Sequence, residues 1–409
     1  MRGRRGAQSR KLTWDRRTIL CVFATVALFG LAFADAAASI LWQSNPDAAF
    51  TLWPNDPRAL TQKADTLLQS TQPRSVSEAA DLSRRSLAKA PLQVRALRVL
   101  GAVSELSGKT QAASVQLQLA GRLSRRDLKT QLWEIEAAIQ RNDISQVLRH
   151  YDIALETKPD SQQLLFPLLA SGLDDPAIRT KYVPYLRSAP TWTLAFLIYA
   201  AERGSAPDAL AVVLAAEKQS VIKWTDEVSP KLLNRLLSIG DFASADLYSR
   251  SLPAHTIGLE RDATLRPATM AATLRPLTWA PREQSGAFAR AESSRSVLHI
   301  YADAQTNGEV LQRFMSLLPG RYILSTSQSF NSAGPDATAR WTIKCLRSGH
   351  FLEQWTSRDP VITGRVRTTE EIVLPPDCQH QYITLTVNGG VEAIPLDYDL
   401  TSIDIKRVS

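Results

Sequence analysis

The sequence lacks the short motifs that mark the common catalytic centres. It contains no Gly-x-Ser-x-Gly elbow, no glycine-rich phosphate loop and no His-Glu-x-x-His, which are signatures of serine hydrolases, nucleotide-binding enzymes and zinc proteases. Histidine is also scarce, with five residues scattered at positions 150, 255, 299, 350 and 380. We therefore expect a protein without enzymatic activity.

Closely spaced carboxylates are few as well. Glu370-Glu371 and Asp397-x-Asp399 are pairs of the kind that glycoside hydrolases use. Neighbouring side chains on a strand point to opposite faces, so Glu370 and Glu371 cannot both reach one sugar. We interpret these acids as solvated surface residues, and a glycan-modifying enzyme is the alternative hypothesis from a different functional class.

Excess positive charge is confined to one end of the chain. The formal net charge is +8, and residues 1–17 hold seven basic residues against one aspartate, so only +2 remains for the other 392 residues. Nucleic-acid-binding domains carry a basic stripe on the folded surface. The charge distribution therefore argues against a nucleic-acid partner.

There is one long apolar run, Thr18 to Ala34, directly after the basic residues. As a helix it spans about 26 Å, and with residues 36–42 it can cross a hydrocarbon core of about 30 Å. The sequence predicts a basic cytoplasmic tail (1–17), a transmembrane signal anchor (18–42) and an exported remainder. A cleaved secretory signal is the alternative, because Ala32-Phe33-Ala34 has the form of a peptidase site.

Only three cysteines are available for cross-linking or metal binding. Cys21 lies in the apolar run, whereas Cys345 and Cys378 lie in the last quarter of the chain. In an oxidising compartment we expect a disulfide between Cys345 and Cys378. Free buried thiols and a metal site with His350 and His380 are the alternatives, although the Cys-x4-His and Cys-x-His spacings miss the usual zinc pattern.

A spacing of 34 residues recurs in the first half of the chain. The stretch EAADLSRRSLAKAP, residues 78–91, has small residues seven apart and a closing proline, and the same positions return further on. This pattern resembles tetratricopeptide repeats, in which small residues let paired helices approach and proline closes each unit. Gly108 and Asn142 are also 34 apart, and both suit the left-handed conformation that ends a helix. The opening segment near PRALTQKADTLLQ keeps little of the pattern. The residues expected to pack the repeats are Ala79, Ala113, Val147, Ala120, Ala154, Pro91 and Pro159.

Helical periodicity continues beyond the repeats to about residue 252. We predict an all-α, tetratricopeptide-like solenoid over 45–252, whose concave surface holds a protein partner. Residues 253–277 contain three prolines and little periodicity, so we interpret them as a linker, with an irregular first edge of the following domain as the alternative.

Over residues 278–409 the sequence pattern changes to short segments rich in β-branched and aromatic residues. Their alternation predicts an antiparallel β-sandwich. It is clearest in two segments, where Trp341, Ile343 and Cys345 share one face and Ile383, Leu385 and Val387 share another, so these are the expected core residues. The segments PLTWAP, LLPGRYILS, EEIVLPPDC and TSIDIKRV resemble jelly-roll carbohydrate-binding modules. The resemblance implies a structural calcium near Asp404 as the one cofactor to consider, and no cofactor is otherwise expected.

Glycan binding in such a module would use exposed aromatic rings, and Trp355, Phe351 and Tyr301 are the candidate ligand-binding residues. The combination of anchor, helical repeats and jelly roll resembles Gram-negative envelope proteins associated with polysaccharide production or export. We expect a single-pass inner-membrane protein with its bulk in the periplasm, which acts as a scaffold through protein contacts and a possible glycan. A general envelope-assembly or cell-division scaffold, or a chaperone, is the alternative.

Overall fold

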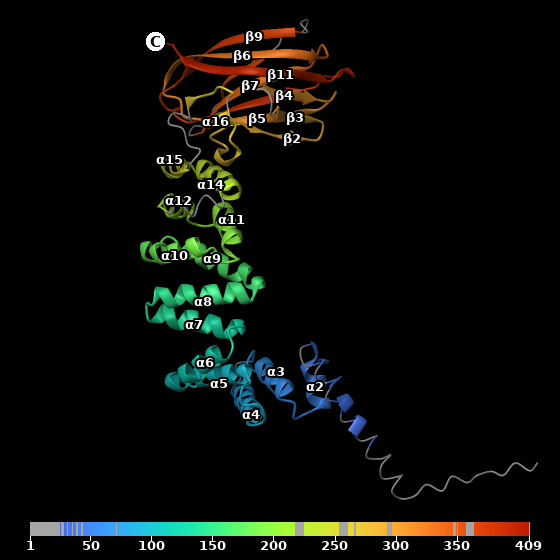
Figure 1. Ribbon diagram of the computed structural model, residues 1–409, viewed down its shortest axis with the longest axis vertical. Coiled ribbons are helices and arrows are strands. Elements are labelled where there is room, and N and C mark those ends of the chain that lie inside the picture. Colours follow the sequence, from blue (N-terminus) through green and yellow to red (C-terminus); the bar gives the residue numbers. More distant parts are fainter. Residues whose placement is uncertain are drawn as a thin grey trace, which may run out of the picture. The chain divides into compact units, whose positions relative to one another are not determined.

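The computed structural model describes residues 44–70, 72–216, 225–252, 261–265, 267–292, 297–346, 349, 351–356 and 364–408, with scattered positions between 25 and 41. By its internal contacts the chain divides into two compact units, Met1–Ser161 and Gln162–Ser409. The first unit is helical, and the second begins with helices and ends with strands (Figure 1). The predicted order of helices followed by antiparallel strands is confirmed, but the helices after residue 161 belong to the unit that contains the strands.

The first unit is built from helical hairpins. Each of α3, α5 and α7 packs against the helix that follows it. The helices are α2 (Pro46–Leu52), α3 (Pro57–Leu67), α4 (Pro73–Lys89), α5 (Val94–Leu106), α6 (Thr110–Leu123), α7 (Leu128–Gln140) and α8 (Ile144–Thr157), followed by the short helix η1 (Pro159–Ser161).

Two of the hairpin turns use the same local device. Gly108 and Asn142 have φ values of 72° and 55°, which is the left-handed conformation that commonly ends a helix. After Asn142, the amide of Asp143 donates to the carbonyl of Ala138 at 2.9 Å and closes α7. The carboxylate of Asp143 then accepts from the amide of Gln146 at 3.1 Å and caps α8. One residue pair therefore ends one helix and begins the next.

The first hairpin departs from the 34-residue spacing. Helices α5 and α7 begin at Val94 and Leu128, whereas α3 begins at Pro57, three residues earlier than that spacing would place it. The turn between α3 and α4 covers residues 68–72, against 107–109 between α5 and α6. This longer turn explains why the opening segment keeps little of the repeat pattern.

The small residues that the sequence placed between the paired helices are buried, except for Val147, which is half-buried. At Gly101 on α5, an added Cβ would lie 2.4 Å from Leu117 Cγ on α6, so these two helices approach as closely as a glycine allows. Pro91 and Pro159 are exposed and follow the last turns of α4 and α8. The buried small residues are Ala79, Ala113, Ala120 and Ala154.

The second unit opens with further helices packed around aromatic side chains. Tyr182, Trp192 and Phe196 are buried and contact one another, with ring centroids 5.5 to 6.4 Å apart. The helices are α9 (Gln162–Gly172), α10 (Pro176–Ser188), α11 (Thr193–Arg203), α12 (Pro207–Ala216), α14 (Thr225–Ile239), α15 (Phe242–Ser251), α16 (Pro267–Met270) and the short η3 (Ala272–Leu274).

The strands form two sheets, and every pairing between described strands is antiparallel. One sheet has the order β1-β5-β10-β7-β8 and the other β2-β3-β4-β11-β6-β9. The bounds are β1 (Ala280–Pro281), β2 (Glu283–Gln284), β3 (Ala287–Glu292), β4 (Val297–Ala302), β5 (Asn307–Met315), β6 (Gly320–Ser332), β7 (Thr338–Cys345), β8 (Phe351–Thr356), β9 (Gly364–Leu374), β10 (Gln381–Asn388) and β11 (Leu396–Arg407).

Alternate residues of both sheets meet in one apolar core. Trp341 and Ile343 on β7 lie opposite Leu385 and Ile383 on β10, and all four are fully buried. The predicted alternation of these two strands is confirmed, and the strands form a β-sandwich.

A disulfide joins Cys345 at the end of β7 to Cys378 just before β10. Both residues are buried, and the bridge closes a loop with a sequence separation of 33 residues. The predicted pairing is confirmed.

The segment predicted as a linker, 253–277, is ordered over its described second half. Ala263 belongs to the sandwich core, and Leu265 and Met270 pack against that core. The indole Nε1 of Trp279 donates to the carbonyl of Ala263 at 3.0 Å. Apolar side chains inside a proline-rich stretch therefore bind it to the sandwich, although its sequence has no clear period.

The start of α15 covers part of the outer face of the five-stranded sheet. Phe314 lies opposite Tyr382, on the side of the sheet away from the core, yet it is 3% exposed. The Phe242 ring stacks on His380, with centroids 3.7 Å apart, and lies 5.9 Å from the Phe314 ring. His380 Nδ1 also lies 3.1 Å from Ser316 Oγ. The helical part thus removes this end of the sheet from water.

Among the described residues, no helix combines the length and the apolar character needed to cross a membrane. The predicted anchor, 18–42, lies mostly outside the described residues, as do Cys21 and His350.

We expect the disulfide to contribute substantially to the stability of the second unit. Closing a loop of this length is worth roughly 3–4 kcal/mol, so Cys345→Ser with Cys378→Ser should lower the melting temperature by on the order of 10 °C. Thermal unfolding followed by near-UV circular dichroism measures this, with Cys21→Ser as the control. A double variant that melts with the oxidised wild type would contradict the expectation.

The packing around His380 predicts a local pH response. Burial lowers the pKa of His380 below its usual 6.5. Because the unfolded chain binds this proton more readily, the unit loses stability as the pH falls through about 6.5 toward the lower folded value. Phe242→Ala should return the pKa of His380 toward 6.5 in an NMR titration, whereas Phe288→Ala should not. Identical titration in wild type and Phe242→Ala would refute the packing argument.

Candidate functional site

The outer face of the six-stranded sheet carries a cluster of aromatic and charged side chains. Strand β4 alternates buried and half-buried residues, so His299 and Tyr301 point away from the core. On the neighbouring strands, Asp399 lies opposite His299 and Phe288 lies opposite Tyr301. Antiparallel pairing therefore gathers residues from distant parts of the sequence into one patch. We call this patch the sheet-face cluster, consisting of Phe288, Arg290, His299, Tyr301, Asn331, Asp397 and Asp399.

The aromatic part of the cluster consists of adjacent rings on β3 and β4. Phe288 and Tyr301 stack with centroids 5.3 Å apart and an interplanar angle of 20°. The guanidinium of Arg290 lies 4.9 Å from the Phe288 centroid, and the His299 ring lies 5.8 Å from it. Both Phe288 and Tyr301 are half-buried, so part of each ring remains at the surface.

The polar part lies beside these rings. His299 Nδ1 is 3.1 Å from Asp399 Oδ1 and 3.7 Å from Asp397 Oδ1. The Asn331 amide donates to Asp397 at 2.9 Å. The three side chains of His299, Asp397 and Asp399 are 26–27% exposed, so the carboxylates keep oxygens available to a ligand in water.

Tyr301 is tied to the same surface by its hydroxyl group. Its Oη donates to Asp303 at 2.8 Å, and this hydrogen bond raises the pKa of the tyrosine. The phenol therefore stays protonated at neutral pH, with its orientation set by Asp303.

The structure separates the three residues predicted to bind a ligand. Tyr301 lies in the sheet-face cluster, whereas Phe351 and Trp355 lie on β8, at the edge of the other sheet. Their side chains lie outside the described residues. Of the other cluster members, Asp397 and Asp399 stood out in the sequence as a spaced pair, but nothing local connected them with Phe288, His299 or Asn331.

Asp404, the predicted calcium ligand, lies on β11 and pairs with Lys406 Nζ at 2.6 Å. Within the described part of the chain, no group of three or more His, Cys, Asp or Glu side chains is arranged to hold a metal ion. Calcium binding at Asp404 stays a prediction from the resemblance.

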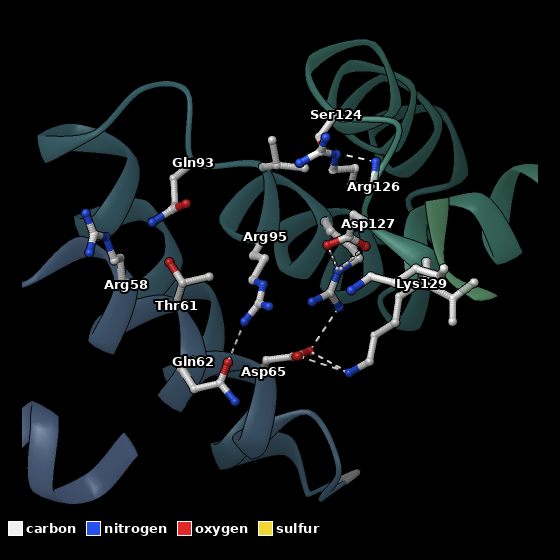
Figure 2. A pocket seen from close by; sticks show the side chains of 14 residues that line it. Arg58, Thr61, Gln62, Asp65, Gln93, Arg95, Ser124, Arg126, Asp127 and Lys129 are labelled. Carbon is white, nitrogen blue, oxygen red and sulfur yellow. Dashed lines mark hydrogen bonds and ion pairs between the residues drawn. The ribbon is translucent and has the colours of Figure 1, made fainter. Parts of the chain in front are cut away.

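A second candidate site lies in the first unit, in a cavity of about 710 Å³. Figure 2 shows its side chains, which come from α3, from the start of α5, from the turn between α6 and α7 with the start of α7, and from the residue after α8. We call it the basic groove. It is lined by Arg58, Thr61, Gln62, Asp65, Gln93, Val94, Arg95, Arg98, Ser124, Arg126, Asp127, Leu128, Lys129 and Lys158.

An ion-pair network forms the floor of the basic groove. Arg98 is buried and contacts Asp65 at 2.9 Å through Nη1 and Asp127 at 3.2 Å through Nε. Lys129 Nζ lies 3.0 Å from Asp65. Asp127 also caps α7 by accepting from the amide of Thr130 at 3.0 Å, so the network links three hairpins.

Charge pairing outweighs burial at Asp65. Desolvation by burial raises the pKa of this carboxyl, but the hydrogen bonds and charges of Arg98 and Lys129 together lower it below its usual value. Burial likewise lowers the pKa of Arg98, while Asp65 and Asp127 raise it above the ordinary value. Both groups are therefore charged at neutral pH, and the floor of the groove is internally compensated.

No family model matches the chain, and no curated protein matches it. Several solved structures are similar to part of it, among them the following three. A CBM4 structure has 12% identity and a TM-score of 0.23, and covers 30% of this chain and 79% of its own. TmCBM61 in complex with beta-1,4-galactotriose has 11% identity and a TM-score of 0.23, and covers 32% and 88%. The K3 cleaved adhesin domain of Lys-gingipain from Porphyromonas gingivalis W83 has 14% identity and a TM-score of 0.17, and covers 26% and 74%. TM-scores this low assign neither a family nor a ligand to the chain.

We expect Arg98 to be the most sensitive residue of the groove floor. In Arg98→Met two largely buried carboxylates lose their shared cation, and Asp65 keeps only Lys129 as a positive partner. The free energy of unfolding should therefore fall by about 3 kcal/mol. Lys129→Met removes a more exposed partner and should cost less than about 1 kcal/mol. Urea unfolding at pH 7 compares the two, and equal losses would contradict the assigned network.

Proposed function

We propose that the chain is a non-enzymatic binding protein whose β-sandwich contacts a glycan through the sheet-face cluster. The observation that carries this proposal is the stacked pair Phe288 and Tyr301 beside the hydrogen-bonded carboxylates Asp397 and Asp399. A sugar ring offers an apolar face and a rim of hydroxyl groups. Aromatic rings suit the first, and carboxylate and amide groups suit the second.

The position of the cluster in the sandwich also favours a ligand-binding role. Strands β3, β4 and β11 hold their outward side chains on a hydrogen-bonded sheet, and sites built on such elements keep their geometry better than sites on loops. The opposite sheet has part of its outer face covered by Phe242 and His380. Among the described side chains, the sheet-face cluster on the six-stranded sheet stays partly exposed.

The helical hairpins supply the second part of the proposed function. Stacked hairpins are suited to holding a protein partner along one surface, and the basic groove is a cavity of this kind. We infer that the chain joins a glycan to a protein partner as a scaffold.

An envelope location completes the proposal. The disulfide supports export, because such bonds persist in oxidising compartments. The basic residues followed by the apolar run at 18–34 favour an inner-membrane anchor with the bulk in the periplasm. In this setting a glycan-binding scaffold would support polysaccharide production or export.

Glycan binding by the full-length protein in detergent tests the proposal. Isothermal titration with exopolysaccharide and O-antigen fragments should give saturable binding without turnover. Tyr301→Ala should weaken binding roughly tenfold, since one aromatic contact is lost, and Asp399→Asn should weaken it as well. Trp355→Ala, on the other sheet, should leave it unchanged.

The same titration distinguishes the alternatives. Loss of binding in Trp355→Ala with Tyr301→Ala unaffected would move the site to the edge strand β8. No binding of any fragment by the folded protein would overturn the glycan contact and favour an assembly scaffold with protein partners alone. Conversion of a glycan, abolished by Asp399→Asn, would replace the binding function with an enzymatic one.

A further inference from the structure

The basic groove has a strong excess of positive charge. Six cationic side chains line it against two carboxylates, which leaves four positive charges around one cavity of about 710 Å³. Outside its first 17 residues the whole chain carries only +2. The groove therefore has a local excess of positive charge, whereas basic and acidic residues nearly cancel over the chain after residue 17.

The positive charge that remains after internal pairing lies at the rim of the groove. Asp65 and Asp127 are both engaged by Arg98, and Asp65 also by Lys129. The side chains of three rim residues are exposed and have no acidic partner in the part of the chain that the structure describes: Arg58, Arg126 and Lys158. In Figure 2, Arg58 and Arg126 lie on opposite sides of the cavity. A ligand between them can meet cations from both sides.

The start of α5 adds a further attraction for a negative group. Helices α3 and α7 are capped by Asp56 and Asp127, whereas Gln93 makes no side-chain cap at the start of α5. Gln93 and Val94 both line the groove. A carboxylate held by the rim cations would therefore also meet the positive end of an uncapped helix.

The lining favours a peptide over a sugar or a nucleic acid. Among the described residues, no aromatic side chain lines the groove, so this lining offers no ring on which a sugar or a base could stack. The amides of Gln62 and Gln93 and the hydroxyls of Thr61 and Ser124 are instead suited to the carbonyl and N–H groups of an extended backbone. The cavity has room for a short segment of chain, with carboxylates reaching the rim on both sides.

We propose that the basic groove binds an acidic, extended peptide segment of a protein partner. Arg58, Arg126 and Lys158 pair with its carboxylates, while Arg98 holds the floor in shape. This inference rests on the proposed scaffold function and deepens it, because it names the chemistry by which the helical part recognises its partner.

Fluorescence anisotropy with the full-length protein tests the inference. The probe is a labelled peptide of alternating Glu and Ser, and the matched probe has Gln in place of each Glu. The acidic peptide should bind saturably, with an affinity that falls as salt rises, and the Gln peptide should not bind. The triple variant Arg58→Ala, Arg126→Ala, Lys158→Ala should lose at least roughly tenfold in affinity.

A second triple variant controls for net charge. Arg74→Ala, Lys89→Ala and Lys109→Ala remove three exposed cations of the same unit that lie outside the groove, and they should leave the affinity within about twofold. No binding of the acidic peptide, an equal loss in both triple variants, or tighter groove-dependent binding of a polyuronate or an oligonucleotide would each overturn the inference. Glycan titration of the same groove variant should match wild type, which separates failure of the groove from failure of the sheet-face site.

Discussion

The contact of Phe242 with His380 and Phe314 joins the helices of the second unit to the outer face of the five-stranded sheet. A sandwich buries one face of each sheet in its core and leaves two outer faces to water. Here the first turn of α15 stacks on the outer side of the five-stranded sheet and buries Phe314 there. The aromatic and acidic side chains gathered on the other outer face stay partly exposed, and this is the surface to which we assign the proposed glycan contact.

In the first unit, the floor and the rim of the basic groove also differ, because the charges of the floor are paired and those of the rim have no acidic partner among the described residues. The buried Arg98 pairs with Asp65 and Asp127, and Lys129 supplies the second positive charge at Asp65, so residues from three successive hairpins are held without an uncompensated charge. Because these acids are used internally, they do not neutralise the rim. Removing an acid from the floor would make the groove more positive but less stable, so affinity and stability are coupled through the same residues.

The sequence was sufficient to predict features that depend only on neighbouring residues, such as turns and the alternation of strands. Gly108 and Asn142 were predictable as left-handed turn residues because few other residues tolerate that backbone, and the alternation in β7 and β10 identified the core faces. The sheet-face cluster was not predictable, because His299 and Asp399 are 100 residues apart and meet only through strand pairing. The outward position of Phe314 could not be predicted from its sequence neighbours. The apolar residues that attach the segment before Trp279 to the core could not be predicted either, because the prolines there interrupt any periodic pattern.

Hydrogen–deuterium exchange of the full-length protein, with and without a saturating glycan fragment, tests most directly whether the outer face of the six-stranded sheet binds the ligand. We expect slower exchange in peptides covering β3, β4 and β11, and no change in β5, β10 or α15. Protection confined to β7 and β8, or to the contact between α15 and the five-stranded sheet, would show that the ligand-binding surface lies elsewhere.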